Sequence, residues 1–140
     1  MKLILDTNFV LVPLRYSLNL EFELNRLAFN EFFMLKECLL ELMHLDEREK
    51  IFGRKMLLRL DPKIIEFKNK KIINEVPYHE LDLSLDWSSN CKSGYCDEAI
   101  LKVAKEFGFA VATLDKKLML ELVKNGVRVV TLSNNVLKLV

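Results

Sequence analysis

Two acidic side chains lie at or just past the ends of apolar runs of strand length, and this placement is the first sign of chemistry in the sequence. Residues 3–5 form a short apolar run that Asp6 breaks, and residues 109–113 form a second run that Asp115 follows. An acid that closes a buried strand is costly unless it is hydrogen-bonded, paired or bound to a cation. Parallel strands that end in Asp place both carboxylates at the sheet edge where α/β proteins bind ligands.

Three further acids belong to segments with a helical pattern. Asp97 and Glu98 stand at the head of a run in which apolar residues recur at helical spacing. Glu41 lies between Leu40 and Leu42 in a predicted helix, so we expect its face to point partly inward. An inward acid without a partner is rare. The alternative is that Glu41 is solvated or pairs with a lysine.

A shared pocket for these acids would require a cation. Several carboxylates cannot remain ionised in one small site unless a cation neutralises them. Oxygen ligands suit Mg²⁺ or Mn²⁺, and such ions activate water and stabilise leaving oxygens on phosphates. The pattern therefore indicates metal-assisted phosphodiester hydrolysis. Two alternatives remain open, namely that Asp6 and Asp115 are helix N-caps and that the acids are scattered over the surface. The candidate metal ligands are Asp6, Glu41, Asp97, Glu98 and Asp115.

Length and composition predict a single globular domain over residues 1–140. Apolar residues make up 51% of the chain and charged residues 29%, which is typical of a globular protein. No window approaches the roughly 20 apolar residues of a membrane helix, and Asp6 interrupts any signal peptide. We therefore expect a cytoplasmic protein with no membrane partner.

Net charge and cysteine content limit the kinds of binding site that the chain can have. The net charge of +1 gives no overall basic field, so nucleic-acid binding must rely on a local patch or on bridging cations. Cys38, Cys91 and Cys96 form an odd set without CxxC spacing. This favours a reducing interior over a disulfide framework and argues against a zinc site. Glycine-rich nucleotide loops and nucleophile motifs are absent.

Strands and helices alternate along the chain, which predicts a three-layer α/β/α domain with a mostly parallel sheet. A polar loop is expected at 88–93, and a helix is expected to follow Asp115. The predicted strands are 2–5, 31–35, 64–67, 109–113 and 127–132. The other predicted helices are 20–29, 36–45, 47–60 and the segment that starts near Asp97 and stops at Gly108.

Four short motifs resemble those of the PIN-domain ribonucleases. They are LILDTNF, CLLEL, GYCDEAIL and VATLDKKL, and they occur in the family's order over almost the full chain. The resemblance implies a flavodoxin-like fold and places the family's four catalytic acids on Asp6, Glu41, Asp97 and Asp115. Glu98 occupies the often acidic position beside the third acid, whereas Glu37 does not fit the motif and is expected to be a surface acid.

Polar residues beside the acids also match the family. Thr7, Asn8 and Thr113 correspond to residues that orient the carboxylates or the attacking water. Lys116 and Lys117 could contact RNA phosphates. VapC-type toxins often have a further acid at the position of Lys117. Because this chain has a lysine there instead, we expect it to bind fewer metals tightly.

Within the family, the chain resembles the ribosomal-RNA-processing branch most and the VapC-type toxins next. Either implies a Mg²⁺- or Mn²⁺-dependent endoribonuclease that acts on RNA. The resemblance also implies a possible homodimer and a protein partner, either an antitoxin or a ribosome-assembly factor. A PIN fold that binds RNA or protein without cleaving is the remaining alternative.

Overall fold

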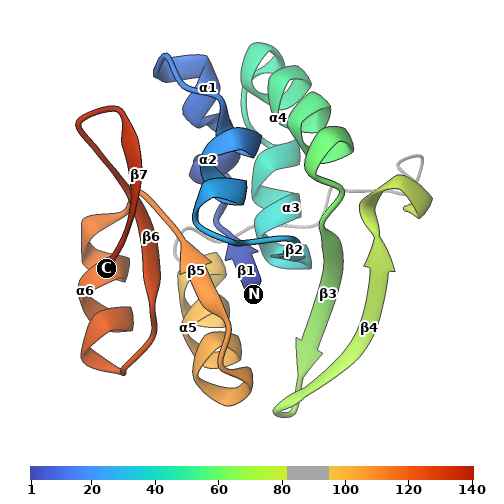
Figure 1. The fold of residues 1–140 in the computed structure, drawn as a ribbon. Coiled ribbons are helices and arrows are strands. Elements are labelled where there is room, and N and C mark those ends of the chain that lie inside the picture. The colour runs from blue at the N-terminus through green and yellow to red at the C-terminus, as the bar shows by residue number, and fades with distance from the viewer. Residues whose placement is uncertain (82–94) are drawn as a thin grey trace.

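A computed structural model describes residues 1–81 and 95–140, with side chains in the second part from Cys96 onward. The polar loop predicted at 88–93 lies outside these residues. Figure 1 shows a twisted sheet with helices on both sides. Among the described helices, none combines the length and the apolar character needed to cross a membrane.

Seven strands form one sheet in the described chain, in the order β4-β3-β2-β1-β5-β6-β7. The neighbours from β3 to β6 are parallel, whereas β4 and β7 join the two edges antiparallel. Strands β1 and β5 pair directly, with Ile4 opposite Val111. The strands are β1 (Lys2–Leu5), β2 (Glu31–Leu35), β3 (Lys63–Lys68), β4 (Lys71–Pro77), β5 (Ala110–Ala112), β6 (Val129–Ser133) and β7 (Val136–Leu139).

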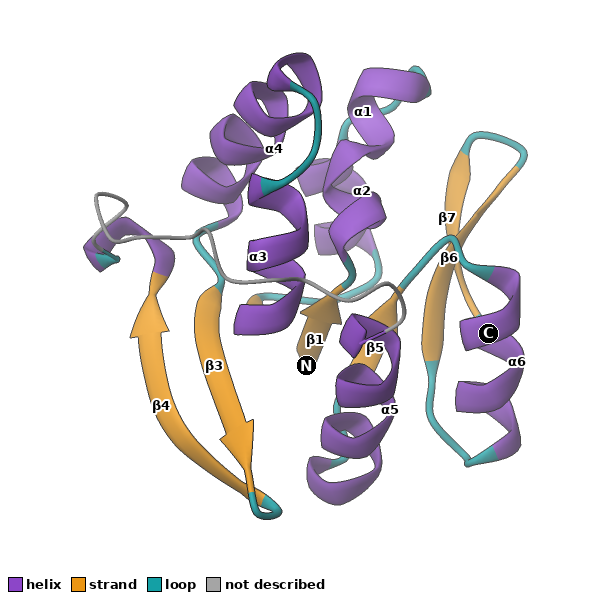
Figure 2. Ribbon diagram, turned by 180° about the vertical axis from the view of Figure 1, so that it is seen from behind, coloured by secondary structure: helices purple, strands orange, loops and turns teal. Residues whose placement is uncertain are grey.

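The helices cover both faces of the sheet, as the predicted three-layer α/β/α architecture requires. Helices α5 and α6 lie on one side, and α1, α2 and α4 lie on the other (Figures 1 and 2). Helix α3 contacts both α4 and α5, so it joins the two layers. The helices are α1 (Val12–Arg15), α2 (Leu20–Arg26), α3 (Lys36–Met43), α4 (Glu47–Leu60), α5 (Tyr95–Phe107) and α6 (Lys116–Lys124), with 3₁₀ turns at Thr7–Leu11 and Tyr78–Glu80.

Strand β1 lies at the centre of the core. Leu3, Ile4 and Leu5 have no exposed surface, as expected for a parallel strand that is covered by helices on both faces. This explains why its sequence is a continuous apolar run rather than an alternating one. A rigid central strand fixes the position of the residue that follows it, Asp6.

The sequence interpretation missed the two edge strands. Strand β4 is mostly exposed and carries Lys, Asn, Glu and Pro, which are common on edge strands because they discourage further pairing. Asn69 and Lys70 form its turn with positive φ angles of 53° and 61°. Asn134 and Asn135 form the corresponding turn before β7, at 51° and 59°. This two-residue geometry favours a hairpin, and Asn tolerates it well.

Candidate metal centre

Asp6 and Thr113 meet because adjacent parallel strands end side by side. The Asp6 backbone N–H donates to the carbonyl of Ala112 over 3.0 Å, so the β1–β5 ladder continues past the end of β1. Thr113 follows β5 immediately and is fully buried, while Asp6 is only 4% exposed. The predicted meeting of the two strand ends is therefore present in the fold.

The Asp6 carboxylate is held at both of its oxygens. Its Oδ1 accepts a hydrogen bond from the Thr7 backbone N–H at 2.8 Å, and its Oδ2 accepts one from the Thr113 hydroxyl at 2.7 Å. The Thr113 oxygen in turn accepts from the Asp115 backbone N–H at 3.1 Å. These bonds fix the carboxylate orientation, which is the usual role of groups that support a metal ligand.

Helices α3 and α5 bring Glu41 and Asp97 into the field of Asp6. Burial is the largest cause that raises the pKa of Asp6, to about 6, and the charges of Asp97 and Glu41 raise it further against hydrogen bonds from Thr113 and Thr7. The pKa of Glu41 is raised by burial and then by the charge of Asp97, although Thr7 offsets part of this rise. Three predicted acids from three elements therefore repel one another in one place.

Asp115 completes the group from the other side. Burial is the largest cause that raises the pKa of Asp97. The charge of Asp115 raises this pKa further, whereas the charge of Lys117 lowers it. Asp115 is exposed and caps α6, accepting at Oδ1 from the backbone N–H groups of Lys117 and Leu118. Asp6 likewise caps the 3₁₀ turn at Thr7–Leu11. The capping alternative is therefore correct for both residues, but capping does not account for the repulsion among the acids.

Other predicted residues lie at different places around this group. Asn8 and Lys116 are exposed. Glu98 is exposed and lines a separate cavity of about 320 Å³, together with Glu37 and Lys102 and the β3–β4 turn. Glu37 is half-buried rather than fully on the surface, and burial raises its pKa.

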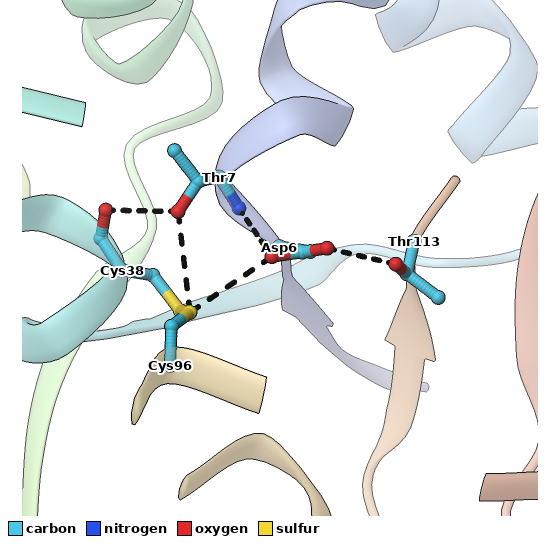
Figure 3. The surroundings of a disulfide bond; sticks show 5 residues. All are labelled: Asp6, Thr7, Cys38, Cys96 and Thr113. Carbon is cyan, nitrogen blue, oxygen red and sulfur yellow. Dashed lines mark hydrogen bonds between the residues drawn. A yellow bond between two sulfur atoms is a disulfide. The ribbon is translucent and has the colours of Figure 1, made fainter. Parts of the chain in front are cut away.

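A disulfide between Cys38 and Cys96 joins α3 to α5 beside Asp6 (Figure 3). The expectation that the cysteines form no disulfide is therefore wrong for this pair. The bond spans 58 residues, so the sequence offers no short motif that predicts it. One signal was nevertheless available, because Cys96 immediately precedes Asp97 and Cys38 lies one helical turn before Glu41.

The donor set fits a hard divalent cation. It consists of carboxylates from two strand ends and two helices, and the charged forms of three of them are disfavoured by burial and mutual repulsion. A cation relieves that repulsion, and all-oxygen ligands are those that Mg²⁺ and Mn²⁺ prefer. Asp6, Glu41, Asp97 and Asp115 are the residues that could hold it.

A mostly parallel α/β/α sheet with clustered acids at its carboxyl edge is the architecture expected for a PIN domain. Comparison with known proteins supports this class. The chain is 30% identical over 132 residues to Ribonuclease VapC4 of Methanocaldococcus jannaschii, which covers 91% of this chain and 87% of that protein. The chain belongs to the PIN-domain ribonuclease family.

A solved structure shares the fold. It is titled "Structure of the PIN domain endonuclease Utp24", and it matches with a TM-score of 0.64 and 20% identity over 99% of this chain and 90% of that one. No protein-family profile matches the chain. The sequence prediction of a PIN-like fold is confirmed.

Proposed function

We propose that the chain is a metal-dependent endoribonuclease whose catalytic acids are Asp6, Glu41, Asp97 and Asp115. The observation that carries the proposal is the electrostatic coupling of these four side chains at one sheet edge. Uncompensated repulsion of this kind destabilises a fold, and it is typical of sites where a cation binds. Membership in a ribonuclease family points to RNA as the substrate.

Each residue has a defined task in this scheme. A bound Mg²⁺ or Mn²⁺ would lower the pKa of a coordinated water and offset charge on the phosphate. Thr113 and the Thr7 backbone N–H hold the Asp6 carboxylate in one orientation. Lys117 lies close enough to Asp97 to lower its pKa, and this supports a role for its ammonium in contacting a phosphate oxygen beside the acids. Thr7, Asn8 and Lys116 are supporting candidates, and Glu98 is a peripheral one.

The substrate is proposed to be single-stranded or unpaired RNA in the cytoplasm. Ribosomal-RNA processing is the reading that the sequence motifs favour. The match to Ribonuclease VapC4 over 91% of the chain favours a second candidate, a VapC-type toxin with a small antitoxin partner. Growth arrest on expression of the parent chain, and none with Asp97→Asn, would support the toxin. Normal growth with intact nuclease activity would support a processing enzyme.

Cleavage of a labelled, partly structured RNA tests the proposal directly. The assay compares Mn²⁺ with EDTA, and the parent with Asp97→Asn. Glu121→Gln is the matched control, since Glu121 is an exposed acid on α6. We expect cleavage that needs the metal and Asp97 but tolerates Glu121→Gln. Metal-independent cleavage, or equal cleavage by Asp97→Asn, would contradict the proposal. Metal binding without cleavage would support a non-cleaving scaffold or a partner-dependent enzyme.

A further inference from the structure

The two cysteines of the disulfide lie directly against the best-positioned acid of the site. The Cys96 sulfur lies 3.9 Å from Asp6 Oδ1 and 4.0 Å from the Thr7 hydroxyl oxygen. The candidate ligand atoms of Asp6, Cys38 and Cys96 all lie within 4.8 Å of one another (Figure 3). All three residues are buried, at 4%, 0% and 1% exposure. The proposed oxygen site does not use either sulfur.

The oxidation state of the pair decides what these sulfurs can do. A disulfide sulfur carries no hydrogen and no negative charge, so it neither donates to Asp6 nor binds metal strongly. Two thiolates are soft ligands that favour ions such as Zn²⁺. We propose that Cys38 and Cys96, when reduced, form with Asp6 a binding site for a thiophilic divalent cation such as Zn²⁺ or Cd²⁺.

The spacing fits such a site. Zinc lies about 2.3 Å from sulfur and about 2.0–2.2 Å from a carboxylate oxygen, so a sulfur and an oxygen on one ion lie within about 4.5 Å of each other. The 3.9 Å between Cys96 Sγ and Asp6 Oδ1 meets this limit. The Cα atoms of the two cysteines are 5.4 Å apart, which leaves side-chain rotation as the only movement needed to separate the sulfurs around an ion.

The surroundings of Asp6 would support the ion as they support the oxygen site. Thr113 holds Oδ2 and the Thr7 backbone N–H holds Oδ1, while the Thr7 hydroxyl donates to the Cys38 carbonyl over 3.0 Å. These bonds fix the Asp6 carboxylate and the backbone of Cys38 near the start of α3, and none of them uses a sulfur atom. Three protein ligands would leave the fourth position of a tetrahedral zinc ion for water.

Conversion between the two states is a balanced exchange. One disulfide and one small dithiol give two cysteine thiols and one oxidised dithiol, with transfer of two electrons and two protons. Cation binding then releases the two thiol protons. The oxidised protein thus offers Asp6 to oxygen-preferring ions, and the reduced protein offers it to thiophilic ions. A thiophilic cation that occupies Asp6 would also inhibit RNA cleavage. That consequence rests on the proposed function, but the cation site itself does not.

Cadmium absorbance tests the site independently of nuclease activity. The protein is a Cys91→Ser variant, which leaves only the two cysteines of interest. It is purified without oxygen in dithiothreitol, and a mass two hydrogens above the air-oxidised form confirms reduction. After removal of the dithiol, Cd²⁺ is added while the ultraviolet band of sulfur-to-cadmium charge transfer is recorded. We expect the band to saturate at one equivalent in the reduced protein and to be absent in the oxidised protein.

Three variants separate this site from the oxygen site. Cys38→Ser should reduce the band by about half or more, and Asp6→Asn should weaken Cd²⁺ affinity at least tenfold. Glu41→Gln should keep the band although it loses Mn²⁺ binding. Circular dichroism confirms that each variant is folded, and Cys96→Ser replaces Cys38→Ser if that variant does not fold. No band in the reduced parent, or equal affinity in Asp6→Asn, would overturn the proposal, as would an air-exposed protein that remains reduced.

Discussion

The two ends of the central strands differ sharply in charge. The carboxyl end carries Asp6 and Thr113, with Asp115 beyond. The amino end opens into a cavity of about 480 Å³ whose lining contains no carboxylate side chain and includes Lys2, Lys105 and Arg128. This opening therefore lies away from the acids. Convergence of charge, and not cavity size, identifies the candidate site.

The connections at each end explain the difference. At the amino end, Gly108 and Gly126 adopt positive φ angles of 72° and 76°, so the turns that enter β5 and β6 are short. At the carboxyl end, the chain leaves β1 and β5 through residues that cap helices and hold one another by hydrogen bonds. A short turn only reverses the chain, whereas a capped helix start presents polar groups to a ligand.

Replacement of Asp6 should have the largest effect at the acidic end. Asp6→Asn retains the shape of the side chain but removes the charge at the most buried position of the site. Loss of a residue that only orients a metal ligand costs roughly 10–100-fold, so loss of a ligand should reduce RNA cleavage by more than that. Cleavage rates in Mn²⁺ measure the effect. A variant that cleaves RNA at the parental rate would mean that Asp6 takes no part in the chemistry.

Reduction of the disulfide should have the next largest effect, which is a loss in the free energy of unfolding. A cross-link that closes a loop of this length stabilises by about 4 kcal/mol in the chain-entropy description, and here the loop spans 58 residues. The free energy of unfolding in denaturant, with and without a dithiol, measures the loss in the Cys91→Ser background. An unchanged value in protein shown by mass to be reduced would mean that the bond does not clamp α3 to α5.

The raised pKa of Asp6 predicts how stability depends on pH. Its ordinary value is 3.8 and its value in the fold is about 6, so between these pH values the folded state binds more protons than the unfolded state. The free energy of unfolding should therefore fall as pH rises from about 4 to about 6, by about 3 kcal/mol from Asp6. The raised pKa values of Glu41 and Asp97 act in the same direction.

Denaturant unfolding at several pH values checks this sign. Asp6→Asn should flatten the decline and should be more stable than the parent near pH 7, despite its loss of activity. Added Mn²⁺ should restore stability to the parent above pH 6 and should do less for the variant. A parent whose stability rises across this range would contradict the electrostatic account of the acidic end.

Asp115 allows the capping and ligand roles to be separated. Asn is as good an N-cap as Asp, so Asp115→Asn should change the free energy of unfolding by less than about 0.5 kcal/mol. The same change removes a charge that acts on Asp97, so cleavage should fall at least tenfold. A variant that keeps both stability and activity would reduce Asp115 to a cap.

The smallest effect is expected at the amino end. Lys105 is exposed and lines the 480 Å³ cavity, far along α5 from the acids. Lys105→Ala should leave RNA cleavage within about twofold, because a solvated surface charge adds little beyond a Debye length of about 8–10 Å. Lys117→Ala is its matched counterpart and should raise the Michaelis constant for RNA. Equal losses in both variants would mean that the two ends share the substrate.

The sequence predicts most of the strands and helices that form the two ends of the sheet, and the predictions that failed have physical causes. Apolar runs at residues 3–5 and 109–113 predict the central strands, because burial on both faces favours apolar residues. The one polar residue in these runs, Thr113, lies just past the observed end of β5. Strand β4 was missed because its exposed residues include Lys, Asn and Glu, which resemble loop composition. Strand β7 was missed because it has only four residues and directly follows a turn of two asparagines. Helix α4 was predicted with its observed bounds, 47–60, and the structure adds Asp46 as its N-cap.

At the site, strand-end position predicts the meeting of Asp6 with the residues after β5. The sequence motifs predict the contributions of Glu41 and Asp97, which depend on how α3 and α5 pack. No short motif predicts the Cys38–Cys96 bond, because it depends on a contact between two helices whose cysteines lie 58 residues apart; the only signal in the sequence is that each cysteine lies beside a motif acid. The resemblance places the third acid on Asp97 and keeps Glu98 as a further candidate ligand. In the fold Glu98 is exposed and lines a separate cavity, because one position along a helix turns a side chain by about 100°.

Calorimetric titration of the oxidised protein with Mn²⁺ at pH 6 tests the central claim most directly. The account predicts saturable binding that releases protons, about half a proton from Asp6 at this pH, and less release at pH 8. Asp97→Asn should bind at least tenfold more weakly, and Glu121→Gln should bind like the parent. No Mn²⁺ binding by the parent, or equal binding by Asp97→Asn, would contradict a metal centre built from these acids.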